Sequence, residues 1–516
     1  MPVKPTPTWV WFVLLTVIAA GVRGYGLGDD ALWFDEAYSF WFSSQSLSDL
    51  WTIIPTIEPH PPLYYTGLKF WRVFGDSEAA LRSLSVLFSA ATVPAIIIFG
   101  RLAGSSTDGA KGAWIGYGAA LLFALSPLHI AFAQQARPYA ALTFFAALAM
   151  CGTAWLITHP EQATKPLFPV SKAATNHRAW AALIGGTAIS LWLHNLAVLL
   201  PAALVVAGVS FYLHGTHNKA GFVRNAAIAS GAVLLLWAPF LPWLWVQSQN
   251  VSAAFWIPAL SLDQFSQTIL RLFSPIILSQ PTVVPVLTAL FLALSVFGVH
   301  ILWRRDDRTM AILLAALTAL PLLLEVLISV TYRPVLIFRS LMWCSVPFYV
   351  LVVIGVGALP RPWMRATAFI AVCLAFIGAD RWPYAGHLDE GWDRVAALIA
   401  AEAAPKDVVF FVPNSAEIPF AYYYPLKVQP ALVPLPAQFP AVGLPNPYPA
   451  GQLGEPALSE QNVRDAVKTA QSFSAVWLIT RMATFDPGDR LKTALLSTRP
   501  QVKTWNFNAV TVYRYQ

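Results

Sequence analysis

The sequence TWVWFVLLTVIAAGVRGYGLGDDALWFDEAYSFWFSS (residues 8–44) joins a long apolar run to two adjacent acids, Asp35 and Glu36, which stand among aromatic residues. The run over 8–25 approaches the ~20 apolar residues that a helix needs to cross a bilayer. Acids beside a membrane segment are costly unless they are paired, hydrated or functional. The stretch therefore predicts a membrane helix followed by an external loop that holds a candidate site.

The rest of the chain repeats the apolar pattern. Of its 516 residues, 57% are hydrophobic and only 11% are charged, and the mean hydropathy is +0.58. This composition excludes an ordinary soluble protein and predicts a polytopic α-helical membrane protein with about 11 transmembrane helices. The expected spans are residues 8–25, 80–100, 112–130, 139–158, 179–193, 195–213, 225–246, 283–303, 309–330, 339–358 and 364–379.

The basic residues of the short loops set the expected orientation, because such loops stay on the cytoplasmic side. A cytoplasmic amino terminus places all of them there, whereas cleavage of the first run as a signal peptide, the alternative, would place them all outside. We therefore expect residues 26–79 and the chain after about residue 380 to lie on the non-cytoplasmic side. The basic residues in question are Arg101, Lys111, Lys165, Lys172, Arg178, Lys219, Arg224, Arg304, Arg305, Arg308, Arg361 and Arg365.

The net charge of +7 follows from this loop pattern. The basic residues are scattered over many loops and form no patch of the kind that binds nucleic acid. Cys151, Cys344 and Cys373 all fall inside apolar runs without a CxxC neighbourhood. We expect these three to be packed side chains and not disulfides or metal ligands.

Composition divides the chain into a transmembrane module, residues 1–383, and a soluble domain, residues 384–516. In the external loops, amphipathic segments at 47–54 and 263–275 predict helices lying in the membrane interface. The soluble part predicts a small α/β domain without a nucleotide-binding motif. Its expected elements are helices at 390–403, 459–472 and 488–497, strands at 407–413 and 474–480, an irregular Pro-rich stretch at 425–458, and a hairpin pairing 501–507 with 509–515.

A second polar motif follows in the first loop, in the sequence IEPHPPLYYTG (residues 57–67). Glu58 and His60 precede a Pro-Pro pair, and Tyr64 and Tyr65 follow it. Because Pro-Pro is extended and stiff, it can hold these side chains at fixed angles. The alternative is a turn that only delivers the chain to the next helix.

Taken in order, the motifs of this chain resemble the GT-C group of membrane glycosyltransferases over residues 8–380. Within it they are most similar to bacterial dolichyl-phosphate-mannose and protein mannosyltransferase-like enzymes, lipid A aminoarabinose transferase-like enzymes and sugar transferases of lipopolysaccharide core. The chain departs from the family at Gln135, where an acid is common, and at Ser340, where Tyr is usual. The motifs are DEA-Y (35–38), E-x-HPPLYY (58–65), FG-x-SE-x-x-LR-x-x-S (74–85), SPLHIAFAQQARPYAALTF (126–144), LWLHNL (191–196) and YRPVLIFRSLMWCSVPFY (332–349).

The resemblance implies transfer of a sugar, with inversion, from a polyprenyl-phosphate carrier to a hydroxyl outside the cytoplasm. It implies a hexosyl or pentosyl transferase in which Asp35 is the catalytic base, which suits a reaction that removes a hydroxyl proton. The leaving phosphate requires positive charge, and Arg binds phosphate oxygens in pairs. The expected phosphate-binding residues are His60, Arg137, Arg333 and Arg339.

A third set of side chains is expected to support the site or to face the acceptor: Glu36, Glu58, Tyr64, Tyr65, Gln135, Tyr139 and His194. Metal dependence stays open at this point. Some relatives hold a divalent cation, Mg or Mn, between loop acids and phosphate, and Asp35 and Glu58 are the candidate ligands here. Because the acid expected at Gln135 is absent, we favour a site that neutralises phosphate with Arg and His or binds metal weakly.

Two other classes of function compete with the enzyme. A transporter or flippase of lipid-linked sugars would use the same charges without chemistry, but we find no paired half-repeat of the kind common in transporters. A sensor whose terminal domain binds sugar would leave the loop motifs unexplained. We therefore expect a multi-pass enzyme of the bacterial inner membrane with its site and terminal domain on the periplasmic side. Its expected partners are a polyprenyl-phosphate sugar, a lipid, glycan or protein acceptor and membrane lipids, but no nucleic acid.

Overall fold

The computed structural model describes residues 8–52, 54–105, 109–167, 176–215, 218–253, 257, 259–380, 389–424, 430–441 and 454–516. It divides into two compact units. Unit 1 comprises Met1–Tyr25, Arg82–Leu241 and Ile257–Ala385, and unit 2 comprises Gly26–Leu81, Pro242–Trp256 and Gly386–Gln516. Contacts thus group the first long loop with the carboxy-terminal residues. The boundary between a transmembrane module and a soluble domain at residue 384 was predicted from composition, and it stays a prediction.

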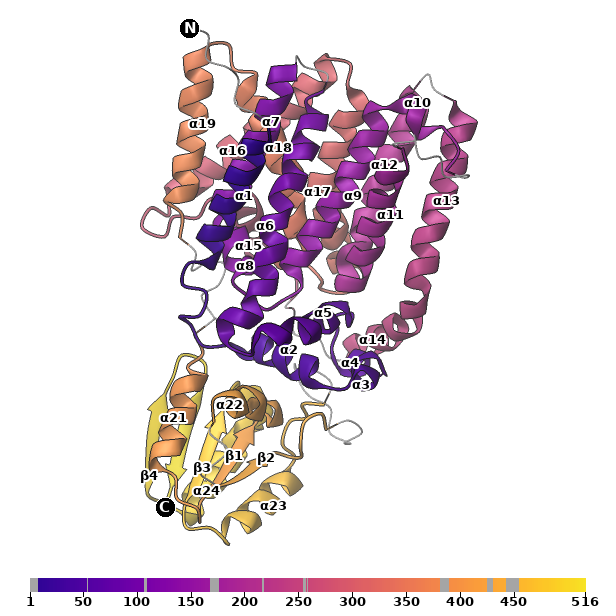
Figure 1. Ribbon diagram of the computed structural model, residues 1–516. Coiled ribbons are helices and arrows are strands. Elements are labelled where there is room, and N and C mark those ends of the chain that lie inside the picture. Colours follow the sequence, from indigo (N-terminus) through magenta and orange to yellow (C-terminus); the bar gives the residue numbers. More distant parts are fainter. Residues whose placement is uncertain are drawn as a thin grey trace. The chain divides into compact units, whose positions relative to one another are not determined.

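Unit 1 is a bundle of long helices that run side by side (Figure 1). Helical structure is present in each of the expected spans, because long apolar runs satisfy their backbone hydrogen bonds internally. The expected span 112–130 is divided between two helices, and 225–246 between three elements. The elements are α1 (Thr8–Gly24), α6 (Glu78–Ala103), α7 (Gly109–Leu125), α8 (Pro127–Ala133), α9 (Tyr139–Thr158), α10 (Pro160–Ala163), α11 (Asn176–Leu193), η2 (Asn195–Val198), α12 (Leu199–His214), α13 (Lys219–Trp237), η3 (Ala238–Phe240), α15 (Leu262–Phe273), α16 (Val283–Arg304), α17 (Arg308–Thr331), η4 (Phe338–Cys344), α18 (Ser345–Gly357) and α19 (Pro362–Ile377).

Length and apolar composition allow seven helices among the described residues to cross a membrane. The pair α7 and α8, bent by 59° at its break, makes an eighth if it is one span. Two further apolar helices, α1 and α19, are shorter. The predicted class, a polytopic helical membrane protein, is confirmed, and the count of eleven spans stays a prediction.

Glycines allow pairs of these helices to approach closely. A Cβ added to Gly186 of α11 would lie 2.5 Å from the carbonyl oxygen of Phe145 on α9. A Cβ added to Gly355 of α18 would lie 2.2 Å from the carbonyl oxygen of Leu294 on α16. Small residues at such crossings are typical of membrane bundles, where close backbone contact replaces the hydrophobic effect as the source of helix association.

The first long loop, in unit 2, is largely helical. Its elements are α2 (Phe34–Ser44), α3 (Leu47–Thr52), α4 (Ile54–Ile57), α5 (Leu63–Trp71) and η1 (Arg72–Phe74), and α14 (Leu241–Ala253) also lies mostly within unit 2. The helix predicted over 47–54 corresponds to α3 and the start of α4, and the one predicted over 263–275 corresponds to α15 of unit 1. The sequence analysis did not predict α2, the helix that carries Asp35.

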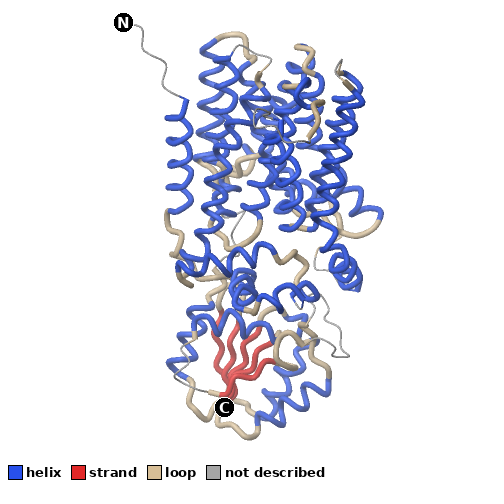
Figure 2. The backbone as a smooth tube through the Cα atoms, turned by 45° about the vertical axis from the view of Figure 1, so that its right-hand side comes forward, coloured by secondary structure: helices blue, strands red, loops and turns tan. Residues whose placement is uncertain are grey.

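The carboxy-terminal part of unit 2 contains a sheet of five strands in the order β2-β1-β3-β5-β4, which Figure 2 shows as one group. Its centre is parallel, with Val408 of β1 opposite both Ala431 of β2 and Val476 of β3, and β5 pairs antiparallel with β3 and β4. The elements are α21 (Trp392–Glu402), β1 (Val408–Val412), η5 (Asn414–Ala416), α22 (Glu417–Tyr423), β2 (Ala431–Pro434), α23 (Glu460–Ala470), β3 (Val476–Thr480), η6 (Ala483–Phe485), η7 (Pro487–Asp489), α24 (Arg490–Thr498), β4 (Val502–Asn506) and β5 (Thr511–Tyr515).

Helices cover both faces of this sheet. The side chains of Val408 and Phe410 pack in one core with Val463 of α23 and Leu495 of α24. On the alternate face, Phe411 contacts Phe420 of α22, with ring centroids 5.1 Å apart. All five residues of β1 are buried, as expected for a central strand of a covered sheet. The predicted small α/β domain is confirmed.

One sequence prediction for this domain was wrong. The stretch 425–458 was expected to be irregular, but Ala431–Pro434 forms β2 at the edge of the sheet. Its prolines obscured the strand, yet an edge position tolerates them because one side of the backbone needs no partner. Residues 425–429 and 442–453 of that stretch lie outside the described residues.

Candidate active site

Asp35 and Glu36 lie in the first turn of α2. Negative side chains are favourable there because the helix amino terminus carries partial positive charge. The two differ in exposure: Asp35 is half-buried, whereas Glu36 is completely buried. The simple alternative of solvated loop acids therefore fails for Glu36, and Asp35 is the member of the pair that retains partial exposure to solvent.

The amino terminus of α2 is held by a residue from the carboxy-terminal part of unit 2. The Phe34 N–H donates to Glu390 Oε2 at 3.2 Å, so a distant carboxylate fills the capping role that Trp33 does not. At the other end, Lys69 Nζ donates to the carbonyl oxygen of Gln45 at 2.7 Å. An acid at the amino end and a cation at the carboxy end both complement the helix dipole.

A guanidinium group stands beside the same turn. Arg481 Nη2 donates to Glu390 Oε1 at 2.9 Å, and the Arg481 guanidinium carbon lies 4.0 Å from the centroid of the Phe34 ring. Burial lowers the pKa of Arg481, but the charges of Glu390 first, and then of Asp35 and Glu455, outweigh it, so the pKa is raised above its usual value. Arg481 is therefore a permanent cation within the electrostatic reach of Asp35.

Tyr38, one turn after Asp35, donates its hydroxyl hydrogen to Glu455. The phenol is fully buried, and burial followed by the charge of Glu455 raises the pKa of Tyr38 well above its usual value. Tyr38 therefore stays neutral and fixes the orientation of a buried carboxylate. Neither Glu390, Arg481 nor Glu455 was predicted from the sequence.

The second loop motif forms its own hydrogen-bonded cluster. Glu58 is completely buried, and its Oε1 accepts from the Tyr65 hydroxyl at 3.0 Å and contacts His60 Nδ1. Gln247 of α14 donates to the carbonyl oxygens of Pro55, at 3.0 Å, and Glu58, at 2.8 Å. The structure thus brings together three predicted residues, and the carboxylate orients the imidazole through Nδ1, which directs Nε2 away from it.

Tyr64 is the remaining predicted residue of this loop. Its ring contacts the Tyr65 ring edge-on, with centroids 6.0 Å apart, and its side chain is buried. The stiff Pro pair directly precedes α5, which carries both tyrosines. The motif is therefore more than a connecting turn, because its side chains form a defined buried cluster.

In unit 1, three predicted residues gather around the start of α9. The Arg339 guanidinium carbon lies 5.8 Å from the centroid of the Tyr139 ring, and the rings of Tyr139 and His194 are 6.0 Å apart. His194 Nδ1 accepts the N–H of Leu196 at 3.1 Å and so caps η2. This bond fixes Nδ1 as the acceptor, which leaves Nε2 as the nitrogen that presents a hydrogen in the neutral ring.

Gln135 and Arg137 are both buried just before this cluster. Gln135 Nε2 donates to the carbonyl oxygen of Ala131 at 3.2 Å, while its Oε1 has no donor among the described residues. The carbonyl oxygen of Arg137 accepts from Ser85 Oγ at 3.2 Å, which ties the segment to α6. A buried amide thus occupies the position where the family commonly has an acid.

Arg333 is placed differently from Arg339. It precedes η4, is half-buried, and lies with its guanidinium carbon 5.4 Å from the Tyr332 ring centroid. A basic residue that the sequence analysis missed is Arg271 of α15, whose guanidinium carbon lies 4.8 Å from the ring centroid of Phe338, the neighbour of Arg339. The sequence analysis predicted this helix from its amphipathic pattern but did not consider Arg271, the basic residue in its last turn, as a site residue.

Among the described residues, no group of three or more His, Cys, Asp or Glu side chains is arranged to hold a metal ion. Glu58, a candidate ligand, already accepts from Tyr65 and contacts His60. Asp35 and Glu58 thus form no group of three such ligands among the described residues, and metal dependence stays a prediction. Asp35 and Glu58 are not proposed as a metal site.

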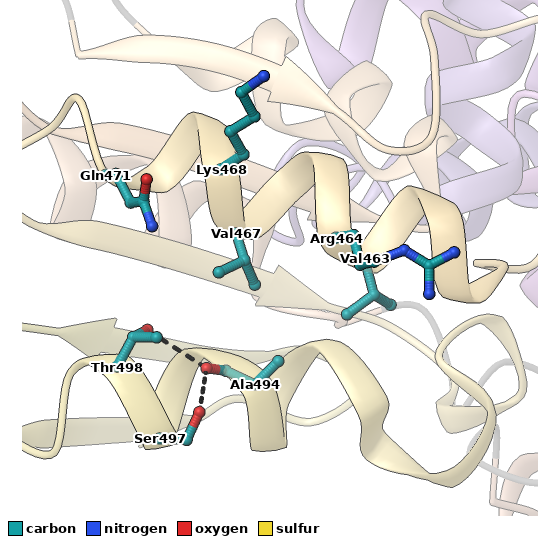
Figure 3. A pocket seen from close by; sticks show the side chains of 8 residues that line it. All are labelled: Val463, Arg464, Val467, Lys468, Gln471, Ala494, Ser497 and Thr498. Atoms are coloured by element: carbon teal, nitrogen blue, oxygen red, sulfur yellow. Dashed lines mark hydrogen bonds between the residues drawn. The ribbon is translucent and has the colours of Figure 1, made fainter.

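Unit 2 also has a shallow hollow of about 300 Å³ between α23 and α24 (Figure 3). Val463, Arg464, Val467, Lys468 and Gln471 line it from α23, and Ala494, Ser497 and Thr498 line it from α24. None of the predicted site residues lines it. We assign it no part in the candidate site.

The chain combines a bundle of apolar helices, a helical first loop with acids at a helix amino terminus, and a small covered sheet. Its fold is that of solved GT-C enzymes, and the resemblance found in the sequence is confirmed at the level of the fold. No protein-family model and no curated protein sequence matches the chain.

Solved structures match over nearly its full length. ArnT from Cupriavidus metallidurans bound to undecaprenyl phosphate is similar with a TM-score of 0.61 and 13% identity, covering 99% of this chain and 98% of that one. The Archaeoglobus fulgidus oligosaccharyltransferase, tethered to an acceptor peptide that contains the NVT sequon, gives 0.55 and 10%, covering 99% and 74%. Its complex with Zn and sulfate gives 0.52 and 11%, covering 98% and 72%.

Proposed function

We propose that this chain is an inverting glycosyltransferase that moves a sugar from a polyprenyl-phosphate donor to a hydroxyl of a lipid, glycan or protein acceptor. The observation that carries the proposal is the setting of Asp35 in a GT-C fold. Its carboxylate is half-buried in the first turn of α2, beside the cation Arg481, while the adjacent Glu36 is wholly buried. Arg481 thus places a positive charge near the carboxylate that is proposed to act as the general base.

In the proposed reaction, Asp35 takes the proton of the acceptor hydroxyl as its oxygen attacks the anomeric carbon. The bond from that carbon to the carrier phosphate breaks, and the phosphate leaves with the electron pair. A positioned carboxylate contributes typically about 10²–10⁴-fold to such a step. Inversion follows from a single displacement, because the hydroxyl attacks opposite the leaving phosphate.

The charge on the departing phosphate needs fixed cations. We assign this role to Arg137, Arg339, Arg333 and His60. Arg339 is held against Tyr139, and His60 is oriented by Glu58, so both are arranged before a ligand arrives. His194, Gln135 and the tyrosines are proposed to shape the surroundings of sugar and acceptor. No step in this scheme requires a metal ion.

The class of donor is supported by the similar structure of ArnT, which was solved with undecaprenyl phosphate. We propose that the transferred sugar is a hexose or a pentose, and contacts between the protein and the sugar would select between the two. We place the protein in the bacterial inner membrane. The basic short loops are expected on the cytoplasmic side, so Asp35 and the carboxy-terminal domain are placed on the periplasmic side.

The test compares wild type with Asp35→Asn. Both proteins are purified and incubated with membrane extract and a panel of labelled polyprenyl-phosphate sugars, and transfer of label is measured. Asp29→Asn, which makes the same change of charge on an exposed acid of the same loop, is the matched control. We expect Asp35→Asn to lose about 10²-fold or more of the rate and Asp29→Asn to retain it.

Equal transfer by wild type and Asp35→Asn would remove Asp35 from its proposed role. A donor that crosses vesicle membranes in the presence of wild type without being consumed would instead support the transporter alternative. Reconstitution in liposomes with donor on one side distinguishes these outcomes, because transport changes the side of the label and transfer changes the molecule that bears it.

A further inference from the structure

The carboxy-terminal domain places three buried or half-buried charged side chains against α2: Glu390, Glu455 and Arg481. Glu390 is shared between three donors. Its Oε2 accepts from the Phe34 N–H at 3.2 Å and from Trp392 Nε1 at 2.7 Å, and its Oε1 accepts from Arg481 at 2.9 Å. A buried carboxylate with this many donors has a fixed position, since each lost bond would leave a buried charge under-solvated.

Arg481 is held by Glu390 and by the sheet. Its backbone N–H donates to the carbonyl oxygen of Val412, which places it at the end of β3 next to β1. Its guanidinium lies over the Phe34 ring at 4.0 Å, at the residue directly before Asp35. The sheet therefore fixes a cation beside the turn that carries the proposed base.

Two tyrosines of α22 add further ties between this domain and the first loop. The Tyr423 hydroxyl accepts from the Leu32 N–H at 2.6 Å and donates to Glu78 Oε1 at 2.8 Å. The Tyr422 hydroxyl donates to the carbonyl oxygen of Asp76 at 2.5 Å. With the bond from Tyr38 to Glu455, these contacts hold the loop both before and after Asp35.

We propose that Arg481 and Glu390 are positioning residues for Asp35: Glu390 fixes the first turn of α2, and Arg481 keeps a positive charge beside the carboxylate. The proposal gives the carboxy-terminal domain a part in the reaction and rests on the proposed function. Neither residue is proposed to touch the donor or the acceptor. Their effect should therefore fall on the rate of the chemical step and not on donor binding.

The first arm of the test measures kcat and KM for the labelled donor that wild type uses best. We expect Arg481→Gln to lower kcat about tenfold or more while KM stays within about threefold. Arg481→Lys, which keeps the charge, should recover most of kcat, and Glu390→Gln should lower it. Arg464→Gln, on the exposed surface of α23, is the control and should match wild type.

The second arm needs no activity. Hydrogen–deuterium exchange of the full chain in detergent is compared for wild type, Glu390→Ala and the charge-neutral double variant Arg481→Gln with Glu390→Gln. We expect faster exchange in peptides covering residues 32–44 of Glu390→Ala, with β3 still protected. The double variant removes both charges of the Arg481–Glu390 ion pair, so neither partner is left as an unpaired buried charge, and loss of positioning is separated from general unfolding.

The outcomes are distinguishable. Unchanged exchange over 32–44 in Glu390→Ala, or equal loss of kcat in Arg481→Lys and Arg481→Gln, would overturn the proposal. If the double variant keeps the sheet protected yet shows slow transfer, the proposal is supported. A wild type that transfers no sugar from any donor contradicts the proposed function, and the exchange arm then decides alone whether Glu390 fixes α2.

Discussion

Neighbouring residues with the same charge have different surroundings in this protein. Glu36 is completely buried, while Asp35 keeps part of its surface exposed near a permanent cation. The sequence identified both acids but could not rank their exposure, because it does not show which distant residues pack against this turn, as Arg481 does near Asp35. Tyr38 and Glu455, for example, are 417 positions apart.

The raised pKa of Tyr38 predicts a dependence of stability on alkaline pH. The folded protein keeps the Tyr38 proton at pH values where the unfolded chain, with a tyrosine pKa of about 10, loses it. The folded state then binds more protons than the unfolded state, so stability falls as pH rises through that range. Thermal unfolding between about pH 9 and about pH 11 should show a steeper loss in wild type than in Tyr38→Phe.

The control for this comparison is Tyr25→Phe, since Tyr25 is exposed. Its profile should follow that of wild type. Other tyrosines with raised pKa, such as Tyr423, contribute equally to all three proteins and cancel in the difference. Parallel curves for wild type and Tyr38→Phe would show that Tyr38 releases its proton equally well in the folded and unfolded states.

At the scale of elements, periodicity and apolar length predicted the helices of the bundle and most of the carboxy-terminal strands. The misses have different causes. Helix α2 carries apolar residues at helical spacing, namely Phe34, Ala37, Tyr38, Trp41 and Phe42, so the signal was present but was not used in the sequence analysis. At 11 residues the helix is short, and contacts such as those of Glu390 and Lys69 hold its ends. Strand β2 was hidden by prolines that only an edge position accepts.

Two adjacent glycines of α11 give a sharp test of bundle packing. A Cβ on Gly186 would meet the backbone of α9 at 2.5 Å, whereas a Cβ on Gly185 has nothing within 4 Å. Gly186→Ala should lower the free energy of unfolding by about 1–3 kcal/mol, because the helices must separate. Gly185→Ala should be neutral or slightly stabilising, since alanine favours helix.

Both variants are measured by thermal unfolding in detergent, followed by tryptophan fluorescence. The two substitutions add the same methyl group one residue apart, so differences in expression or detergent affect them alike. Equal unfolding temperatures for the two variants would mean that α9 and α11 do not approach as closely as described.

At the scale of the whole molecule, the positions of Lys and Arg predict which side of the membrane each loop occupies. We test this in a chain in which Cys151, Cys344 and Cys373 are replaced by Ala and one exposed cysteine is introduced, at Ser472→Cys or Arg305→Cys. An impermeant maleimide should label Ser472→Cys in intact spheroplasts and Arg305→Cys only after lysis. The opposite pattern would reverse the orientation and place Asp35 where the proposed donor is not presented.

The hydrogen bonds between the first loop and the carboxy-terminal domain also impose an order on biosynthesis. Residues 32–78 leave the ribosome long before Tyr423, Glu390 and Arg481 have been made, and β5, which lies between β3 and β4, is translated after both. During that interval the turn bearing Asp35 lacks its cap and its neighbouring cation. A chain that ends before Glu390 would therefore contain the proposed base without the cap of its helix and without the neighbouring cation.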